Sequence, residues 1–157
     1  MEAVLGAMLI EPPGMLVRQL RHDLSRLTER RRMKRADEKI PRLETLQDGV
    51  TKLVCEEAEF VSGARLSFEL QLDHEQRGWR VISFEFHIRL PTERNINMVR
   101  IELNSEPSHD PLRVPRCHLH VGDSQAHIPF PIMNPRLILF LICEHIEPDF
   151  GVVGAQP

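Results

Sequence analysis

Four consecutive stretches of this chain alternate apolar and polar residues with a period of two, beginning at Ala64 and ending at Gly122. One of them places apolar side chains at every second position: Ile82, Phe84, Phe86, Ile88 and Leu90. Successive side chains of a β-strand point to opposite faces of the sheet, so each stretch predicts a strand with one buried face. We therefore predict an antiparallel meander of four strands over residues 64–122, with its apolar face against a core.

The segments that join these strands agree with a meander. Residues 73–78 and 91–95 are short and contain turn-forming residues, as expected for hairpin links. A longer loop with several prolines, residues 105–115, precedes the fourth strand. Residues 123–135 hold three prolines, which excludes a helix or a central strand in that segment.

An amphipathic helix is predicted before the sheet, over residues 15–40. Its apolar stripe contains Val17, Leu20, Leu24 and Leu27. This stripe can belong to the core of the protein or can form a seam between two copies. A run of cations follows it, so the last turns of the predicted helix cannot be buried on every side.

Two further helices are predicted. Residues 135–146 begin with a proline and follow Asn134, and both features are favoured at a helix start. Residues 42–61 contain Leu43, Leu46 and Val50 at helical spacing, which predicts a short helix there. Residues 147–157 are expected to form a flexible tail.

The chain of 157 residues is expected to form one domain with one core. The predicted fold class is α+β, with an N-terminal amphipathic basic helix, a four-stranded antiparallel meander and a C-terminal helix packed on one sheet face.

The three cysteines have no CxxC spacing, which argues for a reducing compartment and against a disulfide framework. Residues 1–10 lack the basic start of a secretory signal, and no apolar run approaches the ~18 residues of a membrane span. We expect a cytoplasmic protein that makes no membrane contact. Cys117 is expected to be buried and inert, unless its strand is turned so that the thiol lies beside His118.

A basic segment stands out against the net charge of −3. Residues 18–42 contain ten Lys or Arg and four Asp or Glu. This segment could bind nucleic acid or an acidic protein partner, dock on the protein's own acidic surface, or simply be solvated. Its candidate binding residues are Arg30, Arg31, Arg32, Lys34 and Arg35.

The fourth strand carries the most unusual pattern, because His118 and His120 are two residues apart. They should share one face of the sheet, whereas Cys117 and Leu119 should point to the core. The predicted register places His118 opposite Glu102. The polar and solvent-exposed face would then gather Glu85, His87, Arg89, Arg100, Glu102, Arg116, His118 and His120.

The predicted registers specify further neighbours on this face. Across the long loop, Arg100 should lie opposite His120. In the preceding hairpin, Arg89 should lie opposite Arg100 and His87 opposite Glu102. A slip of two residues in either pair would keep the same faces and change the partners.

This face admits three interpretations. His118 and His120 could act as an acid–base pair that cleaves RNA without metal, together with His87 and with Glu102 as an orienting group. The phosphate would be held by Arg89, Arg100 and Arg116. Alternatively, His118, His120 and a third His or Glu could bind zinc, with water completing the shell. The face could also be an ordinary solvated surface, and the metal-free interpretation requires no cofactor.

The second half of the chain resembles the TumE-type toxin family of bacterial toxin–antitoxin systems, over about residues 64–146. The similar elements are an Arg-x-acidic strand at Arg100-Ile101-Glu102, a loop with Pro107, His109 and Pro111, the Pro115–Gly122 stretch and the helix after Pro135. The resemblance implies a toxin or defence component that an antitoxin or other protein partner neutralises.

This chain departs from that family pattern at three places. Glu102 stands where aspartate is expected, and one extra residue separates Pro115 from His118. The first 60 residues, including the basic segment, have no counterpart in the compact family pattern.

The order of elements is also similar to that of ubiquitin-conjugating-like and RWD domains, and residues 86–91 resemble their third segment. The catalytic cysteine of that family lies beyond the meander, where this chain has only Cys143, inside the predicted last helix. This position disfavours a conjugating enzyme. It leaves the alternative of a non-catalytic interaction subunit of a larger defence or nucleic-acid-binding assembly.

Overall fold

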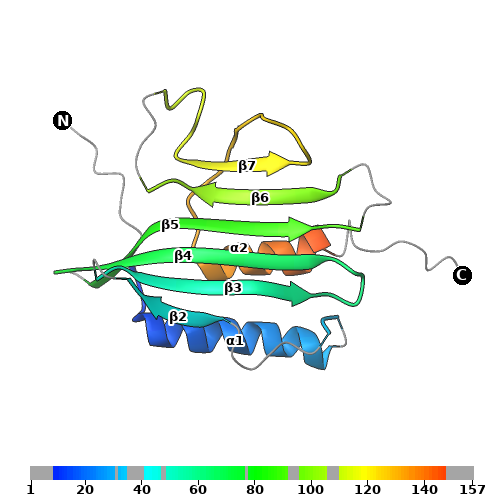
Figure 1. Ribbon diagram of the computed structural model, residues 1–157, viewed down its shortest axis with the longest axis horizontal. Helices are drawn as coiled ribbons and strands as arrows, with labels where there is room; N and C mark the ends of the chain where they lie inside the picture. The colour runs from blue at the N-terminus through cyan, green and yellow to red at the C-terminus, as the bar shows by residue number, and fades with distance from the viewer. Residues whose placement is uncertain are drawn as a thin grey trace, which may run out of the picture.

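The computed structural model describes residues 9–30, 32–34, 41–46, 49–76, 78–91, 96–105 and 110–147. The protein is α+β, and its centre is one antiparallel sheet in which successive strands are neighbours (Figure 1). The strands are β2 (Arg42–Thr45), β3 (Thr51–Glu59), β4 (Arg65–Glu75), β5 (Gly78–Arg89), β6 (Met98–Leu103), β7 (Cys117–Val121) and β8 (Ile128–Pro129). The short β1 (Leu9–Ile10) pairs with the start of β5.

The four predicted strands correspond to β4, β5, β6 and β7, so the predicted meander is present but too small. The sheet continues on one side through β3 to β2, and on the other side to β8. The helix predicted within residues 42–61 is wrong, because β2 and β3 form a hairpin there. Thr51, Leu53 and Cys55 are buried at every second position, and Gly49 supplies the positive φ of 84° in the connecting turn.

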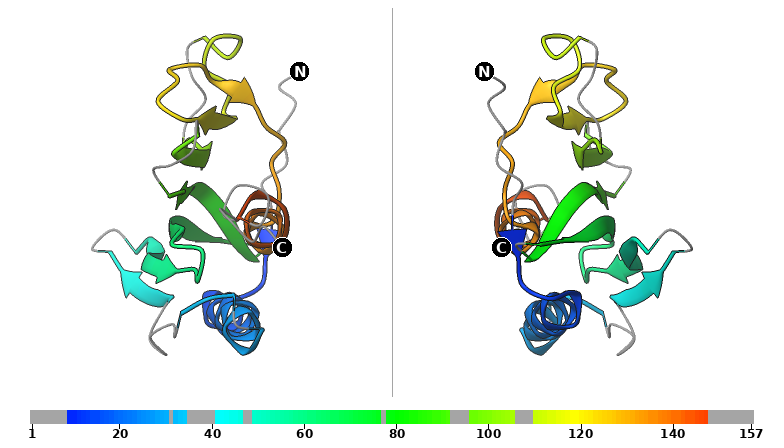
Figure 2. Two further views of the ribbon diagram at one scale, coloured as in Figure 1. Left: turned by 90° about the vertical axis from the view of Figure 1, so that its right-hand side faces the viewer. Right: turned by 90° about the vertical axis from the view of Figure 1, so that its left-hand side faces the viewer.

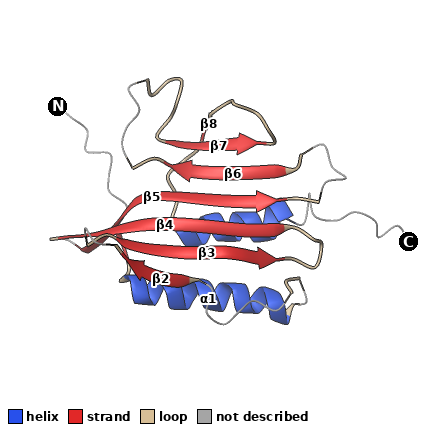
Figure 3. Ribbon diagram, viewed as in Figure 1, coloured by secondary structure: helices blue, strands red, loops and turns tan. Residues whose placement is uncertain are grey.

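Two helical segments cover the same face of the sheet (Figures 2 and 3). One is α1 (Pro13–Glu29), and the other is α2 (Pro135–Leu141), which continues as the π-helix η1 (Ile142–Ile146). The C-terminal helix predicted over residues 135–146 is confirmed in extent, although its last part is π-helical. Asn134 caps it, because its side-chain oxygen accepts a hydrogen bond from the Arg136 N–H at 2.9 Å.

The apolar stripe of α1 is part of the protein core. Leu16, Leu20 and Leu24 are at most 1% exposed, and Leu27 is 5% exposed. They join one cluster with the buried side chains of the sheet and with Ile138 of α2. The stripe is therefore not available as a seam between copies.

The N-terminal helix is shorter than predicted. It ends at Glu29, so Arg30, Arg32 and Lys34 follow the helix instead of lying on it. Met33 is buried and forms an isolated bridge with Phe60, which draws this segment back onto the sheet. The predicted tail beyond residue 147 lies outside the described residues. Within the described part of the chain, no helix is both long and apolar enough to cross a membrane.

Candidate functional site

The histidines of β7 lie opposite the predicted residues of β6. His118 pairs in register with Glu102, and His120 pairs with Arg100. The two imidazoles are on the same face, with ring centroids 4.9 Å apart. Cys117 points into the core, where burial raises the pKa of its thiol to about 11. The strand parity predicted from the sequence is confirmed.

The register between β5 and β6 differs from the prediction by two residues. His87 lies opposite Arg100, and Glu85 lies opposite Glu102. The Leu90 N–H donates a hydrogen bond to the Asn97 carbonyl oxygen at 2.8 Å, so the connection between the two strands is shorter than the predicted register implied. Each side chain stays on the predicted face of the sheet, as expected when the register shifts by two residues.

The expectation that both histidines are solvent-exposed is wrong. His118 is 1% exposed and His120 is 4% exposed. After β7 the chain turns back, and β8 pairs with the outer edge of β7 through Ile128 and Leu119. This return brings His127 against both rings, with centroid distances of 4.7 Å to His118 and 4.6 Å to His120. A metal-free acid–base pair made of His118 and His120 would therefore be out of reach of an RNA strand.

His118 has a defined hydrogen-bonding arrangement. Its Nδ1 atom lies 2.7 Å from the carbonyl oxygen of Pro115, which can only accept, so Nδ1 carries a hydrogen. Its Nε2 atom lies 3.0 Å from Oε2 of Glu102. In a neutral ring this nitrogen presents a lone pair to a carboxylate. The contact is attractive only when a proton or a metal cation lies between the two atoms.

His120 is buried without hydrogen-bond partners. Neither of its ring nitrogens makes a hydrogen bond of normal geometry to a described residue, although Nε2 lies 3.7 Å from Glu102 Oε2 and the Ser124 backbone is close enough to act on the ring. Burial and the charge of Arg100 lower the pKa of His120, against smaller opposing effects of Glu102 and the Ser124 backbone. The Ser124 N–H itself donates to the Val121 carbonyl oxygen at 3.4 Å.

Two partly exposed side chains, His87 on β5 and Arg100 on β6, lie beside this buried cluster, although their Nε2 and Nε atoms are themselves covered. The Nε2 atom of His87 is 2.6 Å from Oε1 of Glu85, and this contact lowers the pKa of Glu85. The Nε atom of Arg100 is 2.6 Å from Oε1 of Glu102. The side chains of His87 and Arg100 are 23% and 31% exposed. A hollow of about 250 Å³ on this open face is lined by Glu85 and Glu102, among other residues.

The other two predicted phosphate-binding residues are more distant from this centre. Arg89 is exposed at the end of β5, two residues beyond His87. Arg116 immediately precedes β7, and its Nε atom donates to the Asn104 carbonyl oxygen at 3.3 Å. The structure therefore groups His87, Arg100 and Glu102 but places Arg89 and Arg116 at opposite ends of the face.

The described cations of the basic run are paired within the protein. Lys34 contacts Glu59 at 2.6 Å, and Arg30 contacts Glu144 at 3.3 Å. Arg32 contacts Glu144 at 2.9 Å and Glu147 at 3.0 Å. Nucleic-acid binding through this run stays a prediction, and it would have to compete with these ion pairs. Arg31 and Arg35 lie outside the described residues.

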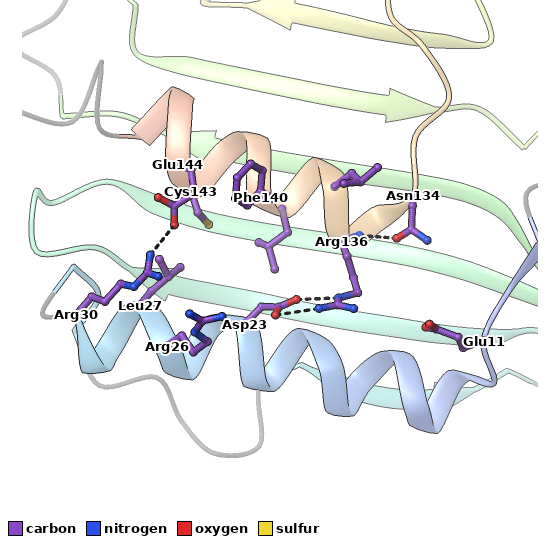
Figure 4. Close-up of a pocket in the computed structure, with 12 residues that line it drawn as sticks. Glu11, Asp23, Arg26, Leu27, Arg30, Asn134, Arg136, Phe140, Cys143 and Glu144 are labelled. Atoms are coloured by element: carbon purple, nitrogen blue, oxygen red, sulfur yellow. Dashed lines mark hydrogen bonds and ion pairs between the residues drawn. The ribbon is translucent and has the colours of Figure 1, made fainter.

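A second hollow lies between α1 and α2 (Figure 4). Its volume is about 630 Å³, and Leu27, Leu139 and Phe140 contribute its apolar lining. Asp23 and Arg136 span it from opposite helices, with two N–O distances of 2.9 and 3.1 Å. Phe140 is 55% exposed beside this groove.

Sequence reasoning missed His127 as a site residue. It lies in an irregular segment, so no periodic pattern indicated its direction. The available signal was indirect, because Gly122 permits a tight reversal and Pro129 suits an edge strand.

No family model, curated protein or solved structure matches this chain. The resemblances to the TumE-type toxins and to RWD domains therefore stay predictions from the residues quoted above.

Proposed function

We propose that this protein is a small toxin-like or defence protein that acts on RNA through the exposed face of β5 and β6. One observation carries the proposal. His87 is held by Glu85 at 2.6 Å and lies opposite Arg100, which is itself held by Glu102 at 2.6 Å. A group for proton transfer and a cation for phosphate oxygens thus lie side by side on an open surface.

In this proposal, cleavage uses the ribose 2′-hydroxyl group of the RNA as the nucleophile. His87 takes the 2′-hydroxyl proton, the oxygen forms a bond to the adjacent phosphorus, and the bond from phosphorus to the 5′ oxygen breaks. The leaving oxygen takes a proton from water. Arg100 stabilises the charge on the phosphorane, and Glu85 positions the His87 ring. Glu102 positions Arg100, and His118 supports Glu102 from the buried side.

Expression in a bacterial host tests the proposal. We expect the wild-type chain to arrest growth and the purified protein to cleave an RNA oligonucleotide. His87→Gln should abolish both effects, whereas Ser67→Ala, at the position opposite His87 on β4, should leave both unchanged. A 2′-deoxy nucleotide at the cleaved position should block the reaction. Unchanged cleavage by folded His87→Gln protein, or no cleavage by the wild-type chain, would contradict the proposal.

A second candidate function is a non-catalytic interaction subunit, and the groove of Figure 4 favours it. Leu137 and Phe140 on α2 are 54% and 55% exposed, although both are large apolar side chains. Such exposure is typical of a surface that another protein covers. Co-purification with the product of an adjacent gene, lost in Phe140→Ser but retained in His87→Gln, would support this function over the RNA-directed one.

A further inference from the structure

We propose that His118, His120, His127 and Glu102 form a binding site for one transition-metal ion of the zinc class. This site is distinct from the exposed His87–Arg100 face, and the inference does not depend on RNA being a substrate. It rests on the placement of the donor atoms, on the hydrogen bonding of His118 and on the unpartnered ring of His120.

The donor atoms of the three histidines lie close together. One ring nitrogen from each of the three histidines lies within 4.8 Å of the other two. A tetrahedral zinc site with bonds of about 2.0–2.1 Å places its donor atoms roughly 3.3 Å apart. The Oε2 atom of Glu102 lies 3.0 Å from His118 Nε2 and 3.7 Å from His120 Nε2, on either side of that value. Glu102 therefore lies beside two of the three histidines, and we assign it as the fourth donor.

The hydrogen bonding of His118 is that of a metal ligand. Its Nδ1–H donates to the Pro115 carbonyl oxygen at 2.7 Å, which fixes the tautomer and aims the Nε2 lone pair at the cluster. In the neutral ring that lone pair faces the Glu102 carboxylate, so a cation bound between the two atoms would be attracted by both. The other carboxylate oxygen contacts Arg100 at 2.6 Å, which orients Glu102 from outside the cluster.

His120 supplies an independent indication of a missing ligand. It is 4% exposed, and neither ring nitrogen makes a hydrogen bond of normal geometry to a described residue, although the Ser124 backbone lies close enough to raise the pKa of the ring against the larger lowering effect of burial. Leaving a buried polar atom unpartnered costs free energy, so such atoms normally point at a ligand, an ion or water. Coordination through Nε2 would satisfy one of these two atoms. The half-buried His127 provides a side from which an ion can enter.

The donor set selects the class of ion. Three imidazoles and one carboxylate suit Zn²⁺ and similar transition metals, whereas Ca²⁺ and Mg²⁺ prefer oxygen donors alone. Four protein donors close a tetrahedral shell, so the ion would be structural. It would fasten the segment that carries His127 onto β6 and β7.

A neighbouring group, Glu85, His87 and Glu102, also offers three potential ligands. Glu102 belongs to this group and is also the carboxylate proposed as a ligand of the histidine cluster. An ion at the histidine cluster would use Glu102 and leave only Glu85 and His87 at this second position, so we assign one ion to the described residues.

Titration of the tag-free, metal-depleted full chain with Zn²⁺ tests the site. We expect one ion per chain, a higher melting temperature with Zn²⁺ and reversal by a chelator. Co²⁺ should give the visible absorption bands of a tetrahedral site. His127→Ala should weaken Zn²⁺ binding by at least about tenfold, while His74→Ala, on the exposed end of β4, should not change it.

Two results would overturn the site: binding well below one ion per chain in the wild type, or wild-type affinity in His127→Ala. Glu102→Gln gives a second measurement if the histidine variant fails to fold, and it should also weaken binding and alter the Co²⁺ spectrum. His87→Gln separates the two proposals, because it should abolish RNA cleavage and leave Zn²⁺ binding intact.

Discussion

At the scale of single residues, Arg32 links the segment after α1 to the C-terminal helix. It donates to the Cys143 carbonyl oxygen and contacts both Glu144 and Glu147. Glu147 is 4% exposed and also accepts a hydrogen bond from the Ser62 hydroxyl at 2.6 Å. Arg32 therefore neutralises a carboxylate that the fold has removed from water.

We predict that Arg32→Ala lowers the free energy of unfolding by about 2–4 kcal/mol, because it leaves the buried Glu147 without its cation. Arg30→Ala is the matched control. The Arg30 side chain is 52% exposed and its ion pair is solvent-screened, so its loss should cost no more than about 0.5 kcal/mol. Urea unfolding at neutral pH measures the free energy of unfolding of both variants. Equal losses would show that the buried Arg32–Glu147 pair contributes no more to stability than the exposed Arg30–Glu144 pair.

At the scale of elements, the return of the chain after β7 determines whether the histidine cluster is covered. Gly122 ends this strand with a φ of 61°, and its N–H donates to the Met98 carbonyl oxygen at 2.7 Å. A residue with a side chain is strained at that φ. The turn therefore requires glycine for its backbone conformation, since an added Cβ would meet nothing closer than 3.9 Å.

We predict that Gly122→Ala destabilises the protein by roughly 1–2 kcal/mol through this backbone strain. Gly14→Ala is the opposite case, because Gly14 lies in the first turn of α1 and an added Cβ would meet nothing within 4 Å. That variant should be neutral or up to about 1 kcal/mol more stable. Thermal unfolding of the two variants compares them, and a neutral Gly122→Ala would show that the turn can relax.

The apolar pattern of each segment determined which elements could be predicted from the sequence. Strands β4 to β7 carry their own alternation, so their faces and the pairing of His118 with Glu102 were predictable. The segment with Leu43, Leu46 and Val50 was misassigned because apolar spacing there fits a helix as well as a hairpin. Gly49 was a better indication than the apolar spacing, because glycine is unfavourable inside a helix and common in hairpin turns. The burial of the histidines was not predictable, because the segment that covers them has no periodic pattern.

At the scale of the whole molecule, the two faces of the sheet have different roles. Both helices cover one face, so the core lies between them and the sheet (Figure 2). The other face carries the polar side chains of β3 to β6, and the loop before β8 places His127 against His118 and His120 of β7. This asymmetry leaves the His87–Arg100 pair accessible while the histidine cluster is enclosed.

The importance of α1 for this arrangement can be tested directly. Leu20 is 0% exposed in the middle of the helix, whereas Met15 on the same helix is 50% exposed. Leu20→Ala removes core contacts and should cost about 2–5 kcal/mol, while Met15→Ala should cost less than about 1 kcal/mol. Deleting residues 1–41 should prevent folding altogether, because it uncovers one apolar face of the sheet. If the truncated chain instead stayed folded and lost only a protein partner, the stripe would be a docking surface and the interaction-subunit function would gain support.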